Sequence, residues 1–383
     1  MPGPLTGIRV IELAGLGPGP FACMLLADLG ADVIRIERPG GSTLPAAAPE
    51  ADLMNRGKRS VIIDLKHPGG VDAVLRLAST ADVFVEGFRP GVAERLGVGP
   101  EAVHELNPRI VYGRMTGWGQ DGPIASTAGH DINYIAVTGA LHAIGSTDGP
   151  PQIPANFLGD FGGGATYLVI GVLAALVEAD RTGSGQVIDA SIVDGTTHLL
   201  TLAHTMLGSG QWKDRRGVNL TDGGRPYYAV YRTRDEQYMA VGAIEPQFYR
   251  ELLRILAIPT DEVDPLHQED PSTWPHTTKR LTEEFATRTQ TDWIQVFAGS
   301  DACVSPILSL RQAGEHPQLL ARRVLTRVSD DLLQPAVAPR FSRHPRIEPG
   351  VPAAIGADTV DVLREVGLDA ARLIADGAAM STE

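Results

Sequence analysis

Short apolar runs and amphipathic stretches alternate over residues 1 to about 125. Residues 8–13, IRVIEL, are apolar and β-branched and run directly into glycines, which predicts a buried strand that ends in a turn. Residues 20–30 carry apolar side chains at helical spacing, with Pro20 in the opening turn and Gly30 as the C-terminal cap. The same order recurs downstream, where we expect a helix at 69–80 and strands at 31–39, 59–65, 81–88 and 108–117. This alternation predicts an α/β protein with a parallel, doubly wound sheet.

The pattern changes in the second half of the chain. Residues 183–210 predict a short strand and a long helix, and residues 219–244 predict a β-hairpin with a polar turn. Pro246 suits the first turn of the helix that follows. Residues from about 225 to 310 therefore indicate a separate, smaller unit of strands and helices. The proline-rich stretch after this unit predicts a strap across another surface, ending in a short helix at 359–367.

Composition and charge narrow the class of protein. The 383 residues, 43% of them hydrophobic, are enough for one large core or two smaller ones. A net charge of −13 argues against a nucleic-acid partner, because phosphate contacts need a basic surface. Two cysteines, Cys23 and Cys303, cannot form a disulfide framework and indicate a reducing compartment.

We expect a soluble, cytoplasmic protein with no membrane partner. The opening residues lack the apolar length of a secretory signal. The most apolar segment, residues 165–179, is shorter than the roughly 20 residues that a membrane span requires. This segment instead predicts a helix buried in a core.

The glycines after the first strand come close to a dinucleotide-binding fingerprint. Strand, glycines, helix and second strand follow in the right order, and an acid, Glu37, lies about 20 residues on. Pro20 stands where the third glycine should be, and a proline there removes a backbone donor. Binding of NAD or FAD is therefore disfavoured. The glycines either make a tight turn or border another ligand.

Basic residues favour a ligand at this place. Arg38, Lys66 and Arg89 directly follow predicted strands, and ligands of open α/β sheets bind at those carboxyl ends. Cations gathered there suit a polyphosphate. The alternative for each residue is an ordinary solvated loop position. The basic residues concentrated in this early part of the acidic chain are Arg38, Arg56, Lys58, Arg59, Lys66, Arg89 and Arg95.

Three acid–base residues, His130, Asp160 and Glu245, stand at junctions between predicted elements. Each has an ordinary interpretation, a structural histidine for the first and helix caps for the two acids. Glycines or an aromatic residue lie close to all three, and such settings allow the backbone to approach a ligand. The three residues are therefore candidates for proton transfer.

Longer motifs carry a family resemblance that extends to about residue 250. They include ELAGLGPGP, LGADVIRIERP, EGFRPGVAERLG, RMTGWGQDGP, GHDINY, NFLGDFGGG and GQVIDASIVDG. With these motifs the chain resembles the family III CoA-transferase superfamily. The stretch GAIEPQFY at 242–249 is similar to the α-methylacyl-CoA racemase branch of that superfamily.

The resemblance implies roles for individual residues. His130 and Asp160 match the catalytic histidine and aspartate, and Glu245 matches a glutamate that hydrogen-bonds the histidine ring. No metal or redox cofactor is implied, because the coenzyme A thioester is itself the substrate. The positions that match CoA contacts are Arg38, Ile63, Asp64, Leu65, Lys66, Gly87, Phe88, Arg89, Arg95, Gly129, Asp131, Ile132, Asn133 and Tyr134.

The resemblance also implies an architecture. A large Rossmann-like, CoA-binding domain (1–190) precedes a linker helix (191–225) and a smaller α+β domain (226–310). A C-terminal segment (311–383) returns to the large domain. Two chains interlock as a homodimer, so that each active site lies between the large domain of one chain and the small domain of the other.

The implied activity is inversion of the α-carbon of a 2-methylacyl-CoA thioester. Two groups on opposite faces of this carbon transfer a proton through an enolate, one acting as base and the other as acid. Histidine titrates near neutrality, whereas Asp160 can hold a proton only if burial raises its pKa. Backbone amides near Asp131 are candidates to stabilise the enolate oxygen.

The residues leave alternatives open. In a CoA-transferase of the same superfamily, Asp160 would be a nucleophile that forms a mixed anhydride with the acyl group. Such enzymes carry a glycine-rich loop in the small domain, whereas GAIEPQFY lacks a run of glycines. A non-catalytic acyl-CoA binder would need the basic residues but not the pair of His130 and Asp160.

Overall fold

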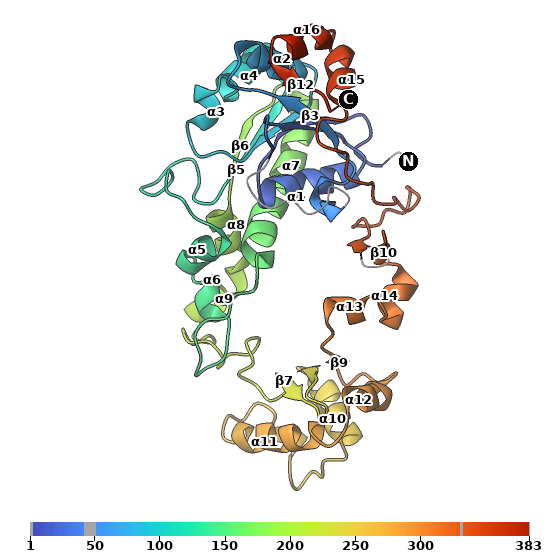
Figure 1. The fold of residues 1–383 in the computed structure, drawn as a ribbon. Coiled ribbons are helices and arrows are strands. Elements are labelled where there is room, and N and C mark those ends of the chain that lie inside the picture. Colours follow the sequence, from blue (N-terminus) through green and yellow to red (C-terminus); the bar gives the residue numbers. More distant parts are fainter. Residues whose placement is uncertain (1–2, 42–50, 330–331, 383) are drawn as a thin grey trace. The chain divides into compact units, whose positions relative to one another are not determined.

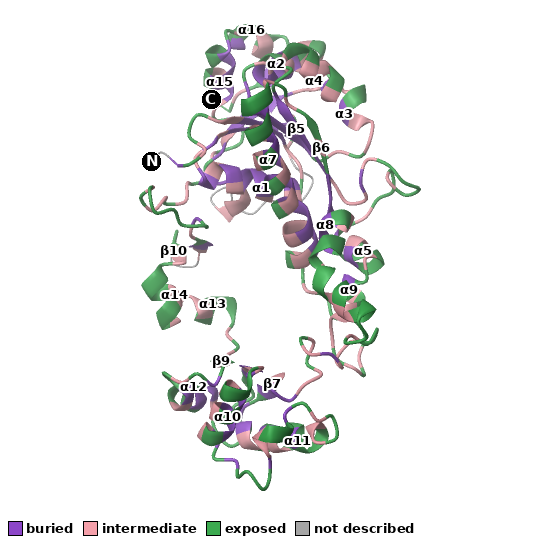
Figure 2. Ribbon diagram, turned by 180° about the vertical axis from the view of Figure 1, so that it is seen from behind, coloured by how far each residue is buried: buried purple, intermediate pink, exposed green. Residues whose placement is uncertain are grey.

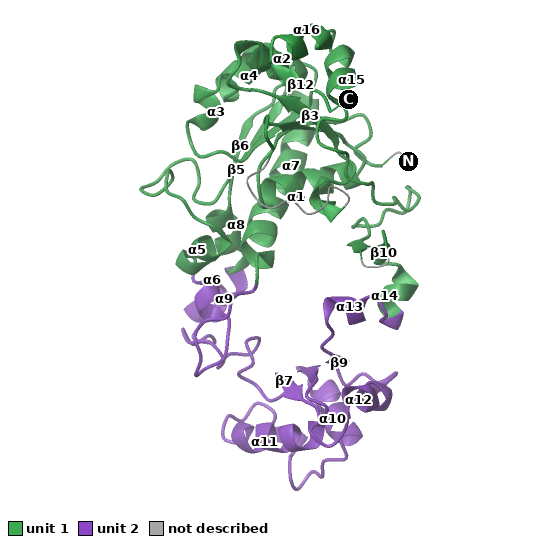
Figure 3. Ribbon diagram, viewed as in Figure 1, with its two compact units in different colours: residues 1–138, 155–200, 318–383 green, residues 139–154, 201–317 purple. Residues whose placement is uncertain are grey.

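The chain folds into two compact units (Figure 3). The computed structural model describes residues 3–41, 51–329 and 332–382. Unit 1 is assembled from three separate segments, residues 1–138, 155–200 and 318–383. Unit 2 consists of residues 139–154 and 201–317.

The two units divide the chain at other positions than the predicted domain boundaries, and the expected linker (191–225) is split between them. Residues 139–154, expected within the large domain, group with unit 2, where Thr147 Oγ1 donates a hydrogen bond to the carbonyl of Gly217. Residues 191–200, expected in a linker, group with unit 1, because their helix packs on the helical segment 157–165. Hydrophobic periodicity indicates which residues are buried but does not indicate which other segment buries them.

Unit 1 is built on a seven-stranded sheet with the order β12-β3-β2-β1-β4-β5-β6. All neighbouring strands are parallel except β12 and β3, which confirms the predicted parallel sheet. The strand order reverses between β1 and β4, and open α/β sheets bind ligands at such a reversal. The strands are β1 (Arg9–Leu13), β2 (Asp32–Glu37), β3 (Arg59–Ile63), β4 (Val83–Glu86), β5 (Val111–Thr116), β6 (Val187–Ser191) and β12 (Ala379–Met380).

Helices cover both faces of this sheet (Figure 1). Successive residues of a strand serve opposite faces, with Val10 in one core and Ile11 in the other. Figure 2 shows the buried residues concentrated in the strands, and this burial on both faces explains why the strands are continuous apolar runs. One face packs on α2 (Pro68–Ala78), α4 (Pro100–Leu106), α15 (Thr359–Glu365) and α16 (Ala370–Ala375). The other packs on α1 (Pro18–Asp28) and α7 (Thr166–Thr182).

Shorter elements complete unit 1. Three of them, α5 (Asp131–Val137), η3 (Phe157–Ala165) and α8 (Ile192–Leu199), pack against one another. The others are η2 (Leu53–Asn55), α3 (Val92–Arg95), α14 (Pro317–Arg322), β10 (Leu325–Arg327) and β11 (Leu333–Pro335).

The helix from Phe157 to Thr182 is longer than the apolar segment in the sequence indicates, because the π-helical η3 continues directly into α7. By length and composition its 26 residues could cross a membrane, and 33% of the most apolar window is buried. In the fold α7 packs on β5, where Leu168 approaches the backbone of Gly113, as expected for a core helix.

Unit 2 contains a three-stranded antiparallel sheet of β7 (Tyr228–Arg232), β8 (Tyr238–Gly242) and β9 (Val304–Pro306). Strands β7 and β8 confirm the predicted hairpin, and α10 begins at Pro246 as expected. Where the pattern predicts one long helix after β6, α8 and α9 are separate helices. The helical elements of this unit are α6 (Ala140–Ala143), α9 (Thr201–Gly208), α10 (Pro246–Ile255), η4 (Pro265–His267), α11 (Trp274–Phe285), α12 (Gln290–Phe297) and α13 (Leu310–Ala313).

Candidate active site

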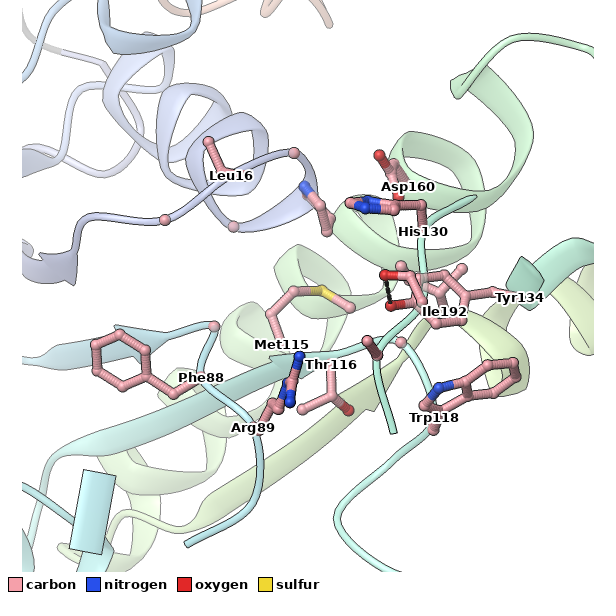
Figure 4. A pocket seen from close by; sticks show the side chains of 18 of the residues that line it. Leu16, Phe88, Arg89, Met115, Thr116, Trp118, His130, Tyr134, Asp160 and Ile192 are labelled. Carbon is pink, nitrogen blue, oxygen red and sulfur yellow. Dashed lines mark hydrogen bonds between the residues drawn. The ribbon is translucent and has the colours of Figure 1, made fainter. Parts of the chain in front are cut away.

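A cavity of about 420 Å³ opens in unit 1 where the strand order reverses. Loops that follow β1, β4 and β5 line it together with the residue before α5 and with η3, and Figure 4 shows their side chains. The cavity brings together two of the three candidates for proton transfer, His130 and Asp160, and five of the expected CoA contacts. These lining residues are Gly87, Phe88, Arg89, Gly129, His130, Tyr134 and Asp160.

His130 directly precedes α5, at the mouth of the cavity. Its backbone N–H donates to Asn133 Oδ1 at 3.0 Å, and this bond fixes the start of the helix. The residue is exposed, and Figure 4 shows its ring close to the carboxyl group of Asp160. An imidazole on the lining of this cavity can accept a proton from a ligand there or return one to it.

Asp160 belongs to η3, and π-helical turns are frequent at functional sites. Its backbone N–H donates to Asp131 Oδ1 at 2.8 Å, and Asn156 Nδ2 donates to its Oδ2 at 3.3 Å. Burial raises the pKa of the Asp160 carboxyl group, and the charge of Asp131 adds to this rise. The hydrogen bond from Asn156 and the charge of His130 oppose it. A raised pKa is what a proton-donating carboxyl group requires.

Asp131 anchors the backbone that carries Asp160. Its side chain is 8% exposed, and it also accepts a hydrogen bond from the backbone N–H of Gly159. A Cβ atom on Gly159 would lie 2.2 Å from Asp131 Oδ1, so a glycine is needed for this close approach. The resemblance makes Asp131 a CoA contact, whereas its carboxylate is turned into the protein.

Gly17 brings the loop after β1 against Asp160. Its φ of 65° lies in the left-handed region, and a Cβ atom there would be 3.0 Å from Asp160 Oδ2. The glycines of the near-fingerprint therefore allow close contact with a candidate catalytic group. Helix α1 then begins at Pro18, and Pro18 and Pro20 remove two amide donors that a dinucleotide pyrophosphate would use. The sequence alone does not reveal Gly17 as a neighbour of Asp160.

Two aromatic residues order the loop in front of His130. The ring of Tyr134 meets that of Trp118 edge to face, with centroids 4.7 Å apart, and Tyr134 Oη donates to the carbonyl of Gly129 at 2.5 Å. A Cβ atom on Gly117 would lie 2.0 Å from the Tyr134 ring, so the glycine makes room for it. In the sequence, the glycines that flank Trp118 in the GWG motif are the feature that could have indicated this packing.

A second cavity of about 400 Å³ shares Leu16 and Phe88 with the first. It combines apolar walls with the cations Arg38 and Lys66 at the carboxyl ends of β2 and β3. Two cavities that share lining residues, one with cations and one with the expected proton-transfer pair, suit a long ligand with an anionic end. The expected CoA contacts that line the second cavity are Arg38, Ile63, Asp64, Leu65, Lys66 and the shared Phe88.

The other expected site residues line neither cavity in the described part of the chain. Arg95 is exposed at the end of α3, and Ile132 and Asn133 are exposed on α5. Glu245 directly precedes α10 in unit 2. It lies near Cys303, because burial of the thiol and, after it, the charge of Glu245 raise the pKa of Cys303. The role of Glu245 toward the histidine ring stays a prediction.

Three of the seven early basic residues form ion pairs with carboxylates of the chain itself, and the pairs of Arg56 and Lys58 are buried. Arg56 Nη2 lies 2.6 Å from buried Asp28 Oδ2, and Lys58 Nζ lies 2.7 Å from buried Glu12 Oε2. Arg59 lies between two acidic side chains. These pairs correct the picture of one ligand-binding cluster, because a charge map of the sequence does not show which cations are already neutralised within the fold.

The profile of CoA-transferase family III matches residues 5–359. The chain belongs to CoA-transferase family III. Within this family it is 43% identical to the α-methylacyl-CoA racemase of Mus musculus over 368 residues, which are 95% of this chain and 93% of that protein. The Homo sapiens protein of the same name is 41% identical over 365 residues, again 95% of this chain and 93% of that protein. The crystal structure of a CaiB/BaiF family protein from Brucella suis has a TM-score of 0.82 at 27% identity and covers 96% of this chain and 100% of that chain.

Proposed function

We propose that this member of the family is an isomerase that inverts the α-carbon of 2-methylacyl-CoA thioesters. The observation that carries the proposal is the pair His130 and Asp160 on one cavity, in a chain 43% identical to an α-methylacyl-CoA racemase. A racemase needs two groups that can each take up and release a proton at working pH. Imidazole does so by its nature, and burial gives the Asp160 carboxyl group a raised pKa.

In the proposed mechanism one residue removes the α-hydrogen as a proton, and the other delivers a proton to the opposite face of the resulting enolate. For one epimer His130 is the base and Asp160 the acid, and for the other epimer the roles are exchanged. The raised pKa of Asp160 supports the step in which it donates. Backbone amides at the start of α5, with that of Asp131, would donate to the enolate oxygen.

The second cavity is the proposed site of the nucleotide end of coenzyme A. Arg38 and Lys66 would contact the phosphates, and the chain of the ligand would pass Leu16 and Phe88 into the first cavity. The thioester is the substrate, and moving a proton to and from one carbon changes no oxidation state, so the reaction requires no redox cofactor. In residues 3–41, 51–329 and 332–382 no three histidine, cysteine or acidic side chains are grouped to hold a metal ion.

We also propose that the protein is a cytoplasmic, interlocked homodimer, in which Glu245 of one chain supports the histidine of the other. Exposed apolar side chains on η3 and α7 support an assembly, since Phe157, Ile170 and Val177 are 67%, 59% and 60% exposed. A second copy of the chain would cover exposed apolar side chains of this kind. Sedimentation equilibrium should give twice the chain mass of 40.7 kDa. A monomer that racemises at full rate would contradict this assembly.

Solvent exchange tests the reaction directly. One epimer of a saturated 2-methylacyl-CoA is incubated with the enzyme in deuterated water. We expect deuterium at the α-carbon together with loss of configuration. Retention of the α-hydrogen, with CoA passing to an added free acid, would contradict the proposal and favour a CoA-transferase, in which Asp160 would be the nucleophile.

A further inference from the structure

A buried ion pair lies under the loop that follows β4. Glu86, the last residue of β4, is 0% exposed, and Arg114 of the adjacent strand β5 is 8% exposed. Arg114 Nε donates to Glu86 Oε1 at 2.9 Å. The other oxygen of Glu86 accepts from the backbone N–H of Phe88 at 2.6 Å. One carboxylate therefore ties β5 to the beginning of the loop.

The guanidinium group of Arg114 also reaches the far end of this loop. Its Nη1 lies 2.9 Å from Glu94 Oε1, and its Nη2 donates to Glu94 Oε2 at 3.3 Å. Glu94 belongs to α3, which begins after the loop and ends at Arg95. A Cβ atom on Gly99 would lie 2.9 Å from Glu94 Cγ, so the following chain closes tightly behind this side chain. Arg114 thus holds residues 87 to 95 at both ends.

Segment 87–95 carries residues to which the proposed function assigns CoA contacts. Its first residues, with Arg89, line the first cavity, and Phe88 lines both cavities. Arg95, at the end of the segment, is a further expected contact. Among the described residues that line the two cavities Arg114 does not occur, so its contribution would pass through the segment.

We propose that Arg114 is a positioning residue, which acts through Glu86 and Glu94 to hold segment 87–95 in the conformation that binds the CoA part of the substrate. This inference rests on the proposed function. Burial raises the pKa of Glu86, while its bonds to Phe88 and to Arg114 oppose the rise. Without the guanidinium group two carboxylates would face each other at the base of a loop whose ligand is an anion. Protonation of Glu86 or movement of α3 would relieve this repulsion, and either change would loosen the loop.

The test compares Arg114→Met with Arg109→Met, which removes the same charge from an exposed arginine just before β5. Calorimetric titration with coenzyme A gives the affinity, and initial rates give KM and kcat. For Arg114→Met we expect weaker CoA binding and a higher KM, each by about 10- to 100-fold, with kcat within about threefold of wild type. Arg109→Met should behave as wild type. Equal CoA affinity of the two variants would overturn the inference.

Two milder variants decide the question if Arg114→Met does not fold. Arg114→Lys keeps the charge but cannot bridge two carboxylates with a planar fork, so its CoA affinity should lie between those of wild type and Arg114→Met. Glu94→Gln weakens the contact to α3 at a side chain that is 45% exposed, and it should also weaken CoA binding. Wild-type affinity in both would overturn the inference. A wild-type enzyme that binds CoA without racemising would contradict the proposed function but not the positioning role.

Discussion

Burial and the like charge of Asp131 raise the pKa of the Asp160 carboxyl group, and a raised pKa helps this group to hold a proton. Two glycines make this arrangement possible, Gly159 next to the Asp131 carboxylate and Gly17 above the Asp160 carboxyl group. His130 shares the same cavity and can carry the complementary proton. The proposed proton transfer would therefore depend on these backbone positions as well as on the two acid–base side chains.

Removing either acid–base group should largely abolish inversion of the α-carbon but still allow exchange of the α-hydrogen with solvent. Asp160→Asn and His130→Gln keep side-chain volume but cannot transfer protons in the same way, so racemisation should fall by about 10²–10⁴-fold. Because each variant retains one base, each should still exchange the α-hydrogen of only one epimer, and the two variants should prefer opposite epimers. Proton NMR in deuterated water measures both quantities. Near-normal racemisation by either variant would show that the role assignment is wrong.

The charge of Asp131 predicts a shift in the pH profile. Asp131→Asn removes a like charge, so the pKa of Asp160 should fall toward its ordinary value. When Asp160 is the base, kcat/KM declines at low pH as the group becomes protonated, and this limb should move to lower pH. When Asp160 is the acid, the decline at high pH should also move to lower pH. Rate profiles for both epimers measure the shift.

A control for this shift is Asp121→Asn, which removes the same charge from an exposed loop position. Its profile should match that of wild type. If the Asp131→Asn profile also matches that of wild type, the Asp160 carboxyl group does not determine the pH at which kcat/KM declines.

Motifs in the sequence predict His130 and Asp160 as candidates, and the structure places both on one cavity, but the sequence does not predict their surroundings. Asp131 and Asp160 are separated by 29 positions, and only the packing of α5 on η3 brings them together. Gly17 is still more distant along the chain. No local pattern encodes such contacts, because each depends on where two separate elements meet.

Between elements, buried ion pairs hold the loops of unit 1 onto its sheet. Lys58 Nζ lies 2.7 Å from Glu12 Oε2 of β1, and it donates to Asn55 Oδ1 at 3.2 Å and to the Pro20 carbonyl of α1 at 2.9 Å. The ammonium group thus has three partners and joins β1, α1 and the segment that leads into β3. Loss of this one group would remove the nearer cation of the buried Glu12 carboxylate and leave it with Arg35, whose Nε lies 3.9 Å from Glu12 Oε1.

Lys58→Met should lower the free energy of unfolding by about 3–5 kcal/mol, because it breaks a buried ion pair and leaves Glu12 with only the longer contact to Arg35 among its ion pairs in the described residues. Arg59→Met is the matched control, since its ion pairs are partly exposed and such pairs contribute about 0–1 kcal/mol. Urea unfolding followed by circular dichroism measures both. The double variant with Glu12→Leu should recover most of the lost stability. Equal losses for the two single variants would contradict the special role of the buried pair.

The elements themselves were largely predictable, because strands buried on both faces leave continuous apolar runs in the sequence. The helix after β6 was not, since α8 and α9 together present one uninterrupted helical pattern. The extension of α7 by η3 was also missed, because its run of glycines is not typical of a helix. In both places packing against neighbours overrides the local preference.

On the scale of the whole molecule, segments far apart in the sequence complete unit 1. Strand β12 pairs with β3, and the backbone N–H of Asp64 donates to the carbonyl of Ala378 at 2.9 Å. Asp64 in turn accepts from the backbone N–H of Lys66 at 2.9 Å. The segment around β12 therefore supports the turn that carries two expected CoA contacts.

A chain that ends at Gly377 should lose affinity for CoA. It lacks β12 and the carbonyl that holds Asp64, so the turn with Lys66 is less well ordered. We expect CoA binding to weaken by about tenfold, measured by calorimetric titration. A chain that ends at Ser381 keeps β12 and is the matched control. Equal affinity of the two chains would show that β12 does not support the turn.

The pairing of β12 with β3 also constrains how the protein can be made in a cell. More than 300 residues separate Ile63 from Ala379, its partner across the sheet. At about 5–20 residues per second, a ribosome needs on the order of 15–60 s to deliver the second strand after the first. During that time the backbone N–H and C=O groups at the edge of β3 lack a partner strand and can pair with other nascent chains. The yield of folded enzyme should therefore depend on chaperones that shield this edge.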